Sequence, residues 1–298
     1  MTLLPAATEI VALLAPESLV GISHECDYPP WVTQLPRVTT TPIDPTAPSA
    51  VIDAQVRAAI ESGRPVIAAD ARTLQTLRPN LIITQGLCEV CAVADGQVHR
   101  LAEALSPEPS VLSLSARTIE GILDDIAAVG RAIDAAGGAG RAGKADEIVA
   151  GLRDRLHQFS ARVAERLRAG GSLPRVVCIE WLDPLYTAGH WTPEMIELAG
   201  GVDVGAKAGE HSRRREWSEI AALNPDVILV ALCGFSEERA RQEWALSPTS
   251  PALPASPALP APPASTRLSF LDGNAYTSRP GPRVVEGVAK ISDSLRGA

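Results

Sequence analysis

Apolar residues recur at spacings of three and four through the middle of the chain, from Thr118 to about Ala169. This spacing places apolar side chains on one face of a helix, so it predicts two long helices separated by a glycine-rich run at 137–143. The apolar positions are Ile119, Ile122, Leu123, Ile126, Val129 and Ile133 in the first helix, and Ile148, Leu152, Leu156, Phe159, Val163 and Leu167 in the second. With a rise of about 1.5 Å per residue, the first helix reaches roughly 25 Å, about the width of a small domain. We therefore expect it to bridge two lobes.

On both sides of this bridge, short apolar runs alternate with helical runs, which is typical of α/β folds with parallel sheets. The segment 77–83 has the pattern of a helix end, a proline turn and an apolar strand, and the segment 223–229 repeats this pattern. The alternative explanation is that such junctions are common and the similarity arises by chance. We predict two parallel-sheet α/β lobes joined by a long rigid bridging helix. The N-terminal lobe spans 1–116, the bridge 117–136 and the C-terminal lobe 137–298.

Composition and charge narrow the class of protein. The 298 residues are 46% hydrophobic and 21% charged, which is typical of a protein that buries real cores. A net charge of -8 argues against nucleic-acid binding, because such a protein presents a basic face. Membrane insertion is not expected, because no apolar run approaches the roughly 20 residues needed to span a bilayer. A proline-rich stretch at 247–265 predicts a semi-extended surface loop inserted in the C-terminal lobe.

The first residues of the chain are relevant to the cellular location of the protein. The chain begins Met-Thr-Leu-Leu-Pro, without a basic segment or signal-type apolar stretch, which predicts a cytoplasmic protein. However, Leu3 and Leu4 have the character of the end of a first strand whose beginning is missing. A lost export signal, and hence a periplasmic or exported protein, is therefore the alternative. The odd number of cysteines, five, does not indicate a disulfide scaffold.

Residue types that bind ligands follow the predicted strands. In open parallel α/β sheets, ligands bind beyond the carboxyl ends of the strands. The candidates are His24, Cys26, Asp27, Tyr28 and Gln85 in the first lobe, and Trp181, His190, Trp191, Trp217, Asn274, Tyr276 and Arg279 in the second. Aromatic residues make up only 4% of the chain, so their concentration at these positions is informative. Flat aromatic walls with a few polar groups indicate a pocket for a large, partly apolar ligand.

Metal or thiol chemistry is the competing interpretation of some of these residues. Cys88-x-x-Cys91 has the spacing of a zinc or redox pair, but zinc needs two more ligands and no second such pair exists. Packing of a loop is the alternative for this pair. His24, with Cys26 nearby, and His190 are either metal ligands or hydrogen-bonded loop residues.

Other signals are weaker. Cys178 lies inside a predicted strand, as a small core residue would. The run 213–215, three arginines, suits either a bound phosphate or carboxylate or a solvated turn. The chain has no Walker loop, no G-x-S-x-G, no G-x-G-x-x-G and no evident catalytic triad, so it is not expected to be an enzyme.

Several of these segments resemble one known family. They are Leu3-Leu4-Pro5-Ala6-Ala7-Thr8-Glu9, the loop Asp27-Tyr28-Pro29-Pro30 and the tail Arg279-Pro280-Gly281-Pro282-Arg283. Together they resemble the vitamin-B12-binding branch of the periplasmic iron/cobalamin-type substrate-binding proteins of ABC importers. The segments His24-Glu25-Cys26, Cys88-Glu89-Val90-Cys91 and Gly189-His190-Trp191 are similar to a subgroup labelled cobalamin-binding. The resemblance implies the class III substrate-binding protein fold, whose two lobes are joined by one rigid helix.

The resemblance also implies a function. Tyr28 and Trp181 would stack on the ligand from opposing lobes, and Trp217, Tyr276 and Arg279 would line the face of the second lobe. The expected function is non-enzymatic binding of cobalamin or a related corrinoid, without a catalytic cofactor, by a monomer. The protein would serve an ABC importer permease or be a cytosolic derivative of such a protein. Two alternatives remain: a metal- or thiol-dependent enzyme that uses the His/Cys cluster, and a binder of heme or another ferric chelate.

Overall fold

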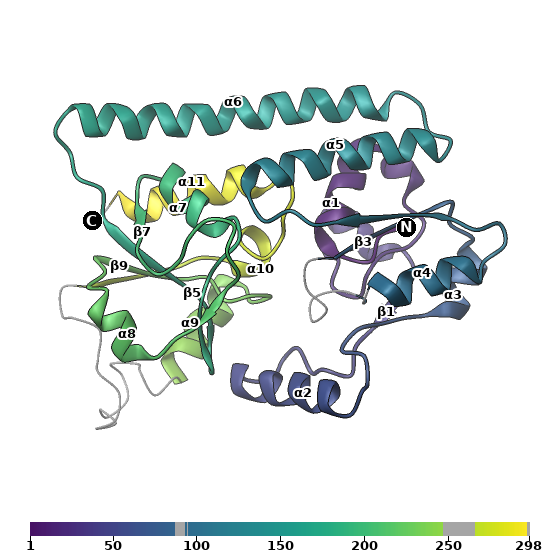
Figure 1. The fold of residues 1–298 in the computed structure, drawn as a ribbon, viewed down its shortest axis with the longest axis horizontal. Helices are drawn as coiled ribbons and strands as arrows, with labels where there is room; N and C mark the ends of the chain where they lie inside the picture. The colour runs from purple at the N-terminus through teal and green to yellow at the C-terminus, as the bar shows by residue number, and fades with distance from the viewer. Residues whose placement is uncertain (87–92, 94, 247–265, 297–298) are drawn as a thin grey trace. The chain divides into compact units, whose positions relative to one another are not determined.

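The computed structural model describes residues 1–86, 93, 95–246 and 266–296 (Figure 1). Cys88, Cys91 and the proline-rich loop predicted at 247–265 lie outside these residues. The chain divides into two compact units. Unit 1 comprises 1–47, 54–116 and 120–151, and unit 2 comprises 48–53, 117–119 and 152–298. The division follows the density of contacts within each unit, and the lobe boundaries expected at 116 and 137 stay a prediction.

Unit 1 is built from short strands and surrounding helices. Its helices are α1 Pro5–Leu14, α3 Ala71–Leu77, α4 Asp95–Glu103 and α5 Ile119–Ala135, with 3-10 turns at Pro16–Ser18 and Pro30–Gln34. Its strands are β1 Thr39–Thr40, β2 Ala68–Ala69, β3 Leu81–Gln85 and β4 Ser110–Leu114. Strands β3 and β4 are parallel, and Thr2 forms a parallel bridge to Ile83 of β3. Strands β1 and β2 form a separate antiparallel pair.

The core of unit 1 gathers apolar side chains from the start of the chain, β3 and the helices beside it. Met1, Leu3, Leu74, Ile82 and Val98 are all buried there. The apolar face that the sequence predicts for the first long helix is also buried along α5. This agreement follows because residues three and four positions apart share a helix face wherever the helix lies.

Three helices have residues in both units, and one of them, α5, has only its first residue, Ile119, in unit 2. Helix α2, Ser49–Glu61, contributes its first residues to unit 2 and the rest to unit 1. Helix α6, Arg141–Arg168, passes from unit 1 to unit 2 between Gly151 and Leu152. The predicted apolar face of α6 is buried at Leu152 and Leu156, whereas Leu167 near its end is 49% exposed.

Unit 2 contains one six-stranded mixed sheet with the order β10-β9-β5-β6-β8, in which β7 also pairs with β5. The strands are β5 Arg175–Leu182, β6 Leu185–Thr187, β7 Val202–Asp203, β8 Arg213–Arg214, β9 Val227–Val230 and β10 Arg267–Phe270. The pairs β10/β9, β9/β5 and β5/β7 are parallel, and the pairs β5/β6 and β6/β8 are antiparallel. The helices are α7 Thr192–Leu198, α8 Trp217–Ala222, α9 Glu237–Leu246, α10 Gly273–Tyr276 and α11 Val284–Leu295.

The core of unit 2 is centred on strands β5 and β9. Val177, Ile179, Ile228 and Val230 are fully buried, and Trp244 of α9 packs into the same cluster. Cys178 of β5 is buried as well, which agrees with its predicted role as a small core residue. Its thiol has a raised pKa, chiefly because burial disfavours the thiolate.

The helix–proline–strand repeat predicted from the sequence is present in both units. Arg78 and Asn224, the residues before the two prolines, both adopt the left-handed conformation with φ of 45°. Each is followed by a buried parallel strand, β3 or β9. The backbone oxygens of Asn80 and Asp226 occupy matching positions, accepting hydrogen bonds from the first residues of β4 and β10 at 3.0 and 2.9 Å. In each unit the chain therefore passes from helix to strand through the same type of turn.

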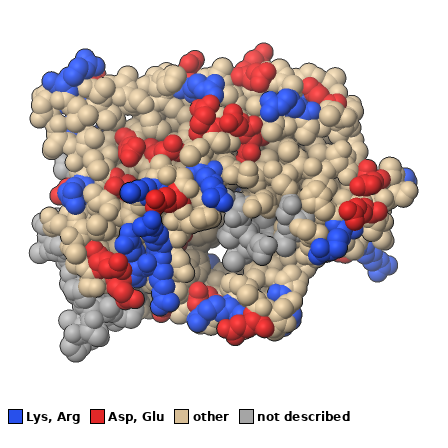
Figure 2. All heavy atoms as spheres, viewed as in Figure 1, with Lys and Arg blue, Asp and Glu red and all other residues tan. Residues whose placement is uncertain are grey.

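The surface carries both charge signs. On the face seen in Figure 2, acidic and basic side chains are interspersed, which agrees with the absence of a strong basic balance in the sequence. Among the described residues, no helix is both long enough and apolar enough to cross a membrane.

Candidate ligand-binding site

In unit 1, the candidate residues other than Gln85 lie on one loop between Ser23 and Pro30. Two consecutive prolines exclude a regular helix here, and the Tyr28–Pro29 peptide bond is cis. Arg37 fixes the loop, because its Nη1 donates to the backbone oxygens of Ser23 at 2.8 Å and Cys26 at 2.5 Å. The loop is therefore held through its backbone oxygens.

The side chains of His24 and Cys26 each have a hydrogen-bond partner within unit 1. The Nδ1 of His24 lies 2.7 Å from Oγ1 of Thr39. Burial, and secondarily the charge of Arg37, lowers the pKa of His24. Cys26 is only 1% exposed, and its Sγ lies 2.9 Å from Oγ1 of Thr8. Among the described residues, no group of three His, Cys, Asp or Glu side chains is placed to hold a metal ion. Metal binding at this loop therefore stays a prediction that involves residues outside the described ones.

Two aromatic side chains of unit 1 are exposed. Tyr28 is 42% exposed and Trp31 is 43% exposed, and Asp27 beside Tyr28 is exposed as well. Trp31 was not among the candidates that the sequence selects, although it follows the Tyr-Pro-Pro run directly. Gln85 is half-buried at the end of β3. Exposed aromatic rings on a fixed loop are suitable for contact with a flat conjugated ligand.

In unit 2, Trp181 lies near the end of β5 and is half-buried. Its Nε1 donates to the backbone oxygen of Asp183 at 3.1 Å. The buried ring of Phe235 meets it edge to face, with centroids 5.5 Å apart. The Asp183–Pro184 peptide bond that follows is cis. Trp181 is thus an aromatic side chain with a fixed orientation, part of whose surface is accessible.

The segment that contains His190 lies against the segment around His211. The backbone N–H of His190 donates to the oxygen of Glu210 at 2.6 Å, and the N–H of Gly209 donates to the oxygen of His190 at 2.8 Å. The Nε2 of His190 lies 3.2 Å from Nδ1 of His211. Burial first, and then the charges of His211 and Arg117, lowers the pKa of His190.

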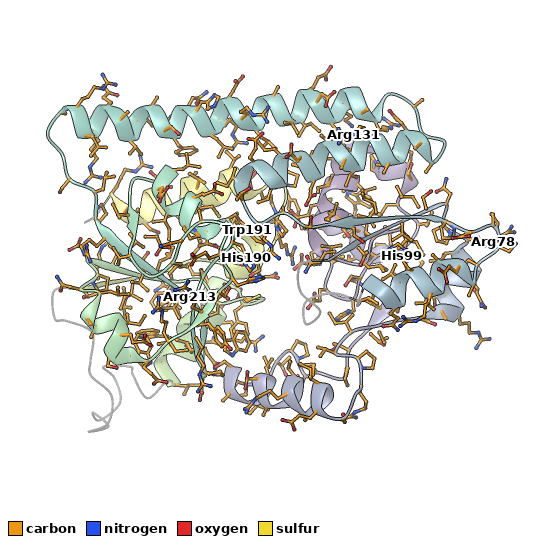
Figure 3. The ribbon with its side chains drawn as sticks, viewed as in Figure 1. Arg78, His99, Arg131, His190, Trp191 and Arg213 are labelled. Carbon is orange, nitrogen blue, oxygen red and sulfur yellow. The ribbon has the colours of Figure 1, made fainter. Side chains whose placement is uncertain are left out.

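Trp191 follows His190 but is buried, with 6% of its surface exposed. Its Nε1 donates to the backbone oxygen of Thr277 at 3.0 Å, which anchors the start of α7 to the segment after α10. Figure 3 shows His190, Trp191 and Arg213 in the same part of unit 2. Arg213 is exposed and pairs with Glu210 at 2.6 Å. A direct role of Trp191 in ligand contact stays a prediction.

Asn274 and Tyr276 lie in the short helix α10, and Arg279 follows it by three residues. Asp272 caps this helix, because its Oδ1 accepts from the N–H of Ala275 at 2.7 Å. The Nη2 of Arg279 donates to Oδ1 of Asn274 at 2.9 Å, and Arg279 is only 5% exposed. The guanidinium of Arg283 lies 5.8 Å from the ring centroid of Tyr276. These side chains form two contact pairs within unit 2, Arg279 with Asn274 and Arg283 with Tyr276.

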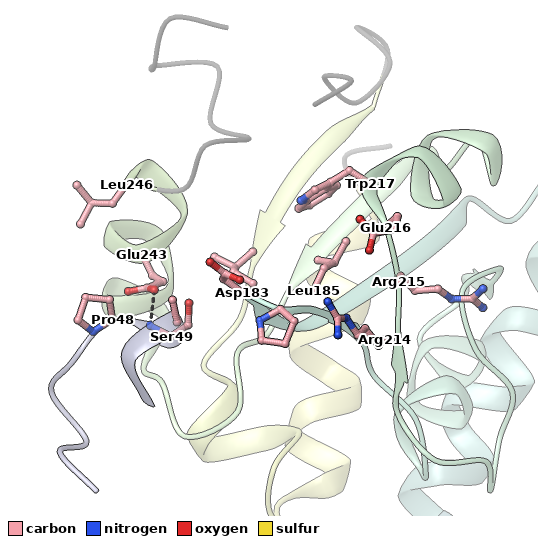
Figure 4. A pocket seen from close by; sticks show the side chains of 13 residues that line it. Pro48, Ser49, Asp183, Leu185, Arg214, Arg215, Glu216, Trp217, Glu243 and Leu246 are labelled. Atoms are coloured by element: carbon pink, nitrogen blue, oxygen red, sulfur yellow. Dashed lines mark hydrogen bonds between the residues drawn. The ribbon is translucent and has the colours of Figure 1, made fainter. Parts of the chain in front are cut away.

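Unit 2 also contains a cavity of about 460 Å³ beside β6 and α8 (Figure 4). Leu182, Leu185 and Trp217 supply its apolar wall, and charged side chains of Arg214 and Glu216 lie at its edge. Pockets of this size hold small molecules. One further contact closes a side of the cavity: the N–H of Ser49, the first residue of α2, donates to Oε1 of Glu243 at 2.7 Å.

Of the residues that line this cavity, the sequence selected Trp217 as a candidate ligand contact and Arg214 and Arg215 within the run 213–215. The indole of Trp217 is 8% exposed and meets the ring of Trp244 edge to face, with centroids 5.6 Å apart. The cavity was not predictable because its wall combines a hairpin, a helix start and the beginning of α2, which are distant in the sequence. Of the three arginines at 213–215, only Arg214 and Arg215 line it.

Comparison with known proteins gives matches in structure only. No protein-family model matches the chain, and no curated protein matches its sequence. A periplasmic heme-binding protein from Pseudomonas aeruginosa has a TM-score of 0.70 at 19% identity, over 100% of this chain and 92% of that chain. The periplasmic heme-binding protein BhuT, in complex with two hemes, has a TM-score of 0.68 at 21% identity, over 99% and 97%. The periplasmic vitamin B12 binding protein BtuF of Vibrio cholerae has a TM-score of 0.62 at 21% identity, over 99% and 95%.

These matches cover both units and confirm the predicted fold class. The chain has the α/β fold of the class III substrate-binding proteins, a class that includes periplasmic solute-binding proteins of ABC importers. The heme and vitamin B12 matches have similar scores, so the fold agrees with more than the B12-binding branch alone.

Proposed function

We propose that this chain is a non-enzymatic substrate-binding protein of the ABC-importer type, and that its ligand is a metal-centred tetrapyrrole. The observation that carries the proposal is the structural similarity to periplasmic heme- and vitamin-B12-binding proteins over 99–100% of this chain. A corrinoid is the first candidate, because the sequence resembles the B12-binding branch at its start, its Tyr-Pro-Pro loop and its Arg-Pro-Gly-Pro tail. Heme is the second candidate.

The aromatic side chains support a flat, conjugated ligand. In unit 1, Tyr28 and Trp31 are both exposed, and in unit 2 the ring of Trp181 is fixed by Phe235 and Asp183. Aromatic faces contribute large contact areas at a small entropic cost and prefer offset-stacked or edge-to-face partners. A tetrapyrrole has two broad faces that such rings can cover. Tyr28, Trp31 and Trp181 are the residues proposed for this role.

The heme candidate has support of its own in the side-chain chemistry. Heme iron is held by axial ligands from the protein, among them His nitrogen and Tyr oxygen. The exposed phenol of Tyr28 is such a donor, and the imidazole ring of His190 is another. A cobalamin carries its own nitrogen base on cobalt and depends more on flat contact. The two ligands therefore make different demands on the same residues.

Titration of the purified protein with cyanocobalamin and, separately, with hemin tests the proposal. Calorimetry and visible absorption are followed together, because coordination changes the absorption bands whereas stacking alone changes them little. We expect one of the two ligands to bind with a dissociation constant of about 1 μM or below, which corresponds to roughly 8 kcal/mol. If neither ligand gives binding heat or a spectral change, the proposal is wrong.

The proposed role includes a permease partner and a location outside the cytoplasm. Fractionation of cells that carry the full-length gene with a C-terminal tag separates this location from a cytoplasmic one. Recovery of the tag in the periplasmic or secreted fraction would support delivery to an importer. Recovery in the cytoplasm together with corrinoid binding would support a cytosolic derivative.

A further inference from the structure

Two imidazole rings meet edge to face on neighbouring segments of unit 2. The Nε2 of His190 and the Nδ1 of His211 are 3.2 Å apart, and the ring planes are inclined by 84°. Two backbone hydrogen bonds hold the segments together, one from His190 N–H to the oxygen of Glu210 and one from Gly209 N–H to the oxygen of His190. The ring nitrogens are therefore positioned by a fixed backbone as well as by the rotamers of the two side chains.

The backbone at these two rings is unusual. His190 has φ of +54°, in the left-handed region that non-glycine residues seldom adopt. A Cβ atom at Gly189 would lie 2.6 Å from the backbone oxygen of Glu210 and from the backbone carbon of His211, so no other residue fits there. Strained backbone of this kind costs roughly 1–3 kcal/mol and is concentrated at functional sites.

The separation of the two nitrogens matches the spacing of two ligands on one metal ion. With metal–nitrogen bonds of about 2.0–2.1 Å, two nitrogens on a tetrahedral ion lie roughly 3.3–3.4 Å apart, and two at a right angle lie roughly 2.9 Å apart. The observed 3.2 Å is between these values. We propose that His190 and His211 form a bidentate site for a divalent first-row transition-metal ion of the zinc or copper type.

The proposed site has two protein ligands. Within the described residues no third His, Cys, Asp or Glu completes a ligand set, and the nearby Glu210 carboxylate is paired with Arg213 at 2.6 Å. The remaining coordination positions are open to water or to donor atoms of a small molecule. Imidazole ligands suit copper, nickel and zinc, and copper binds most tightly in this order. An ordinary N–H···N hydrogen bond between the rings is the alternative arrangement, and experiment separates the two.

Metal titration of the tag-free protein tests the site. CuSO4 and ZnCl2 are the probes, followed by calorimetry and, for copper, by electron paramagnetic resonance. We expect one equivalent to bind, with nitrogen coupling in the copper spectrum. Affinity should fall by at least about tenfold in His211→Gln and in His190→Asn. His157→Gln is the matched control, because His157 is an exposed histidine on α6 and its loss should leave the affinity unchanged.

The Cys88→Ser/Cys91→Ser double variant is the second control, because these cysteines are the competing metal ligands in the chain. Its affinity should equal that of the wild type. Absence of metal binding by the wild type, binding that survives His211→Gln, or binding lost only in the double cysteine variant would each overturn the proposal. His211 is exposed, so His211→Gln should melt at the wild-type temperature even if His190→Asn does not fold. His211→Gln is also titrated with hemin and with cyanocobalamin. These titrations show whether ligand binding, the proposed function, persists in this variant, so that failure of one proposal is distinguished from failure of the other.

Discussion

Arg279 and Asn274, both predicted from the sequence to contact a ligand, contact each other. The Nη2 of Arg279 donates to Oδ1 of Asn274 at 2.9 Å, five residues away across helix α10. Arg279 is only 5% exposed, and the N–H of Asn274 donates to the backbone oxygen of Phe235 at 3.1 Å. This link joins the end of α10 to the loop after β9. Within unit 2, Arg279 therefore has a structural role whether or not it also contacts a ligand.

Replacement of Arg279 by methionine should destabilise unit 2. The change removes a buried, charge-assisted hydrogen bond and leaves the amide of Asn274 without that donor, so we expect a loss of about 2–4 kcal/mol in the free energy of unfolding. Urea denaturation followed by tryptophan fluorescence measures this loss. Arg296→Met is the matched control, because Arg296 is exposed near the end of the chain, and it should change stability little. Equal stability of Arg279→Met and the wild type would show that the arginine does not support the fold.

The side chain of Tyr28 should separate the two candidate ligands. Tyr28→Phe keeps the ring and removes the phenol oxygen, so corrinoid binding should persist, whereas heme binding should weaken and its absorption bands should shift if the oxygen ligates iron. Tyr28→Ala removes the ring and should weaken both ligands by about 1–2 kcal/mol. Calorimetry and visible absorption measure these effects. Tyr28 is 42% exposed, so neither change should disturb the fold.

Tyr186→Phe in strand β6 is the control for the loss of a phenol oxygen. This variant should bind both ligands as the wild type does. If Tyr28→Ala binds hemin and cyanocobalamin with unchanged affinity, Tyr28 lies outside the ligand site and the proposed contact is wrong.

Asp203 should make stability depend on pH. Burial raises the pKa of this carboxyl to about 6. The hydrogen bonds that its Oδ1 accepts from the N–H groups of Gly205 at 2.8 Å and Ala206 at 3.0 Å lower the pKa, but their effect is smaller. Because the folded state takes up a proton near pH 6 and the unfolded state only near pH 4, the folded state is favoured at low pH. This contribution is lost as the pH rises from about 4 to about 6, and it amounts to about 3 kcal/mol.

Asp203→Asn checks this dependence. The amide keeps an oxygen for the two backbone donors and carries no charge, so the variant should be more stable than the wild type at pH 7. The difference should shrink as the pH falls towards 4. Urea denaturation between pH 4 and pH 8 measures it. A difference that is the same at every pH would show that Asp203 does not titrate with a raised pKa.

Gly273 should tolerate no side chain. A Cβ atom there would lie 2.1 Å from the backbone oxygen of Leu232, so Gly273→Ala requires the backbone to move and should prevent stable folding of unit 2. Gly151→Ala on α6 is the matched control, because a Cβ there meets no atom within 4 Å. In an exposed helix, replacing glycine by alanine stabilises by roughly 0.5–1 kcal/mol. Thermal melting followed by circular dichroism distinguishes these opposite effects, and equal melting temperatures of the two variants would contradict the prediction.

Features that depend on neighbouring residues were predictable from the sequence. The buried face of α5 follows from apolar spacing alone, and the turns at Arg78 and Asn224 follow from the proline after each. Such features are decided within one helical turn or one dipeptide, because sterics and periodicity act over that distance. The α/β class follows from the same local evidence, since strands and helices alternate along the chain.

The tertiary structure decided which candidate side chains face outward and which meet one another. The sequence treats Tyr28 and Trp191 alike, yet Tyr28 is 42% exposed and Trp191 is buried with its indole bonded to Thr277. The pairing of His190 with His211 joins residues 21 positions apart through a glycine that accepts no side chain. Burial and contact of this kind depend on how distant segments pack, and no local pattern carries that information.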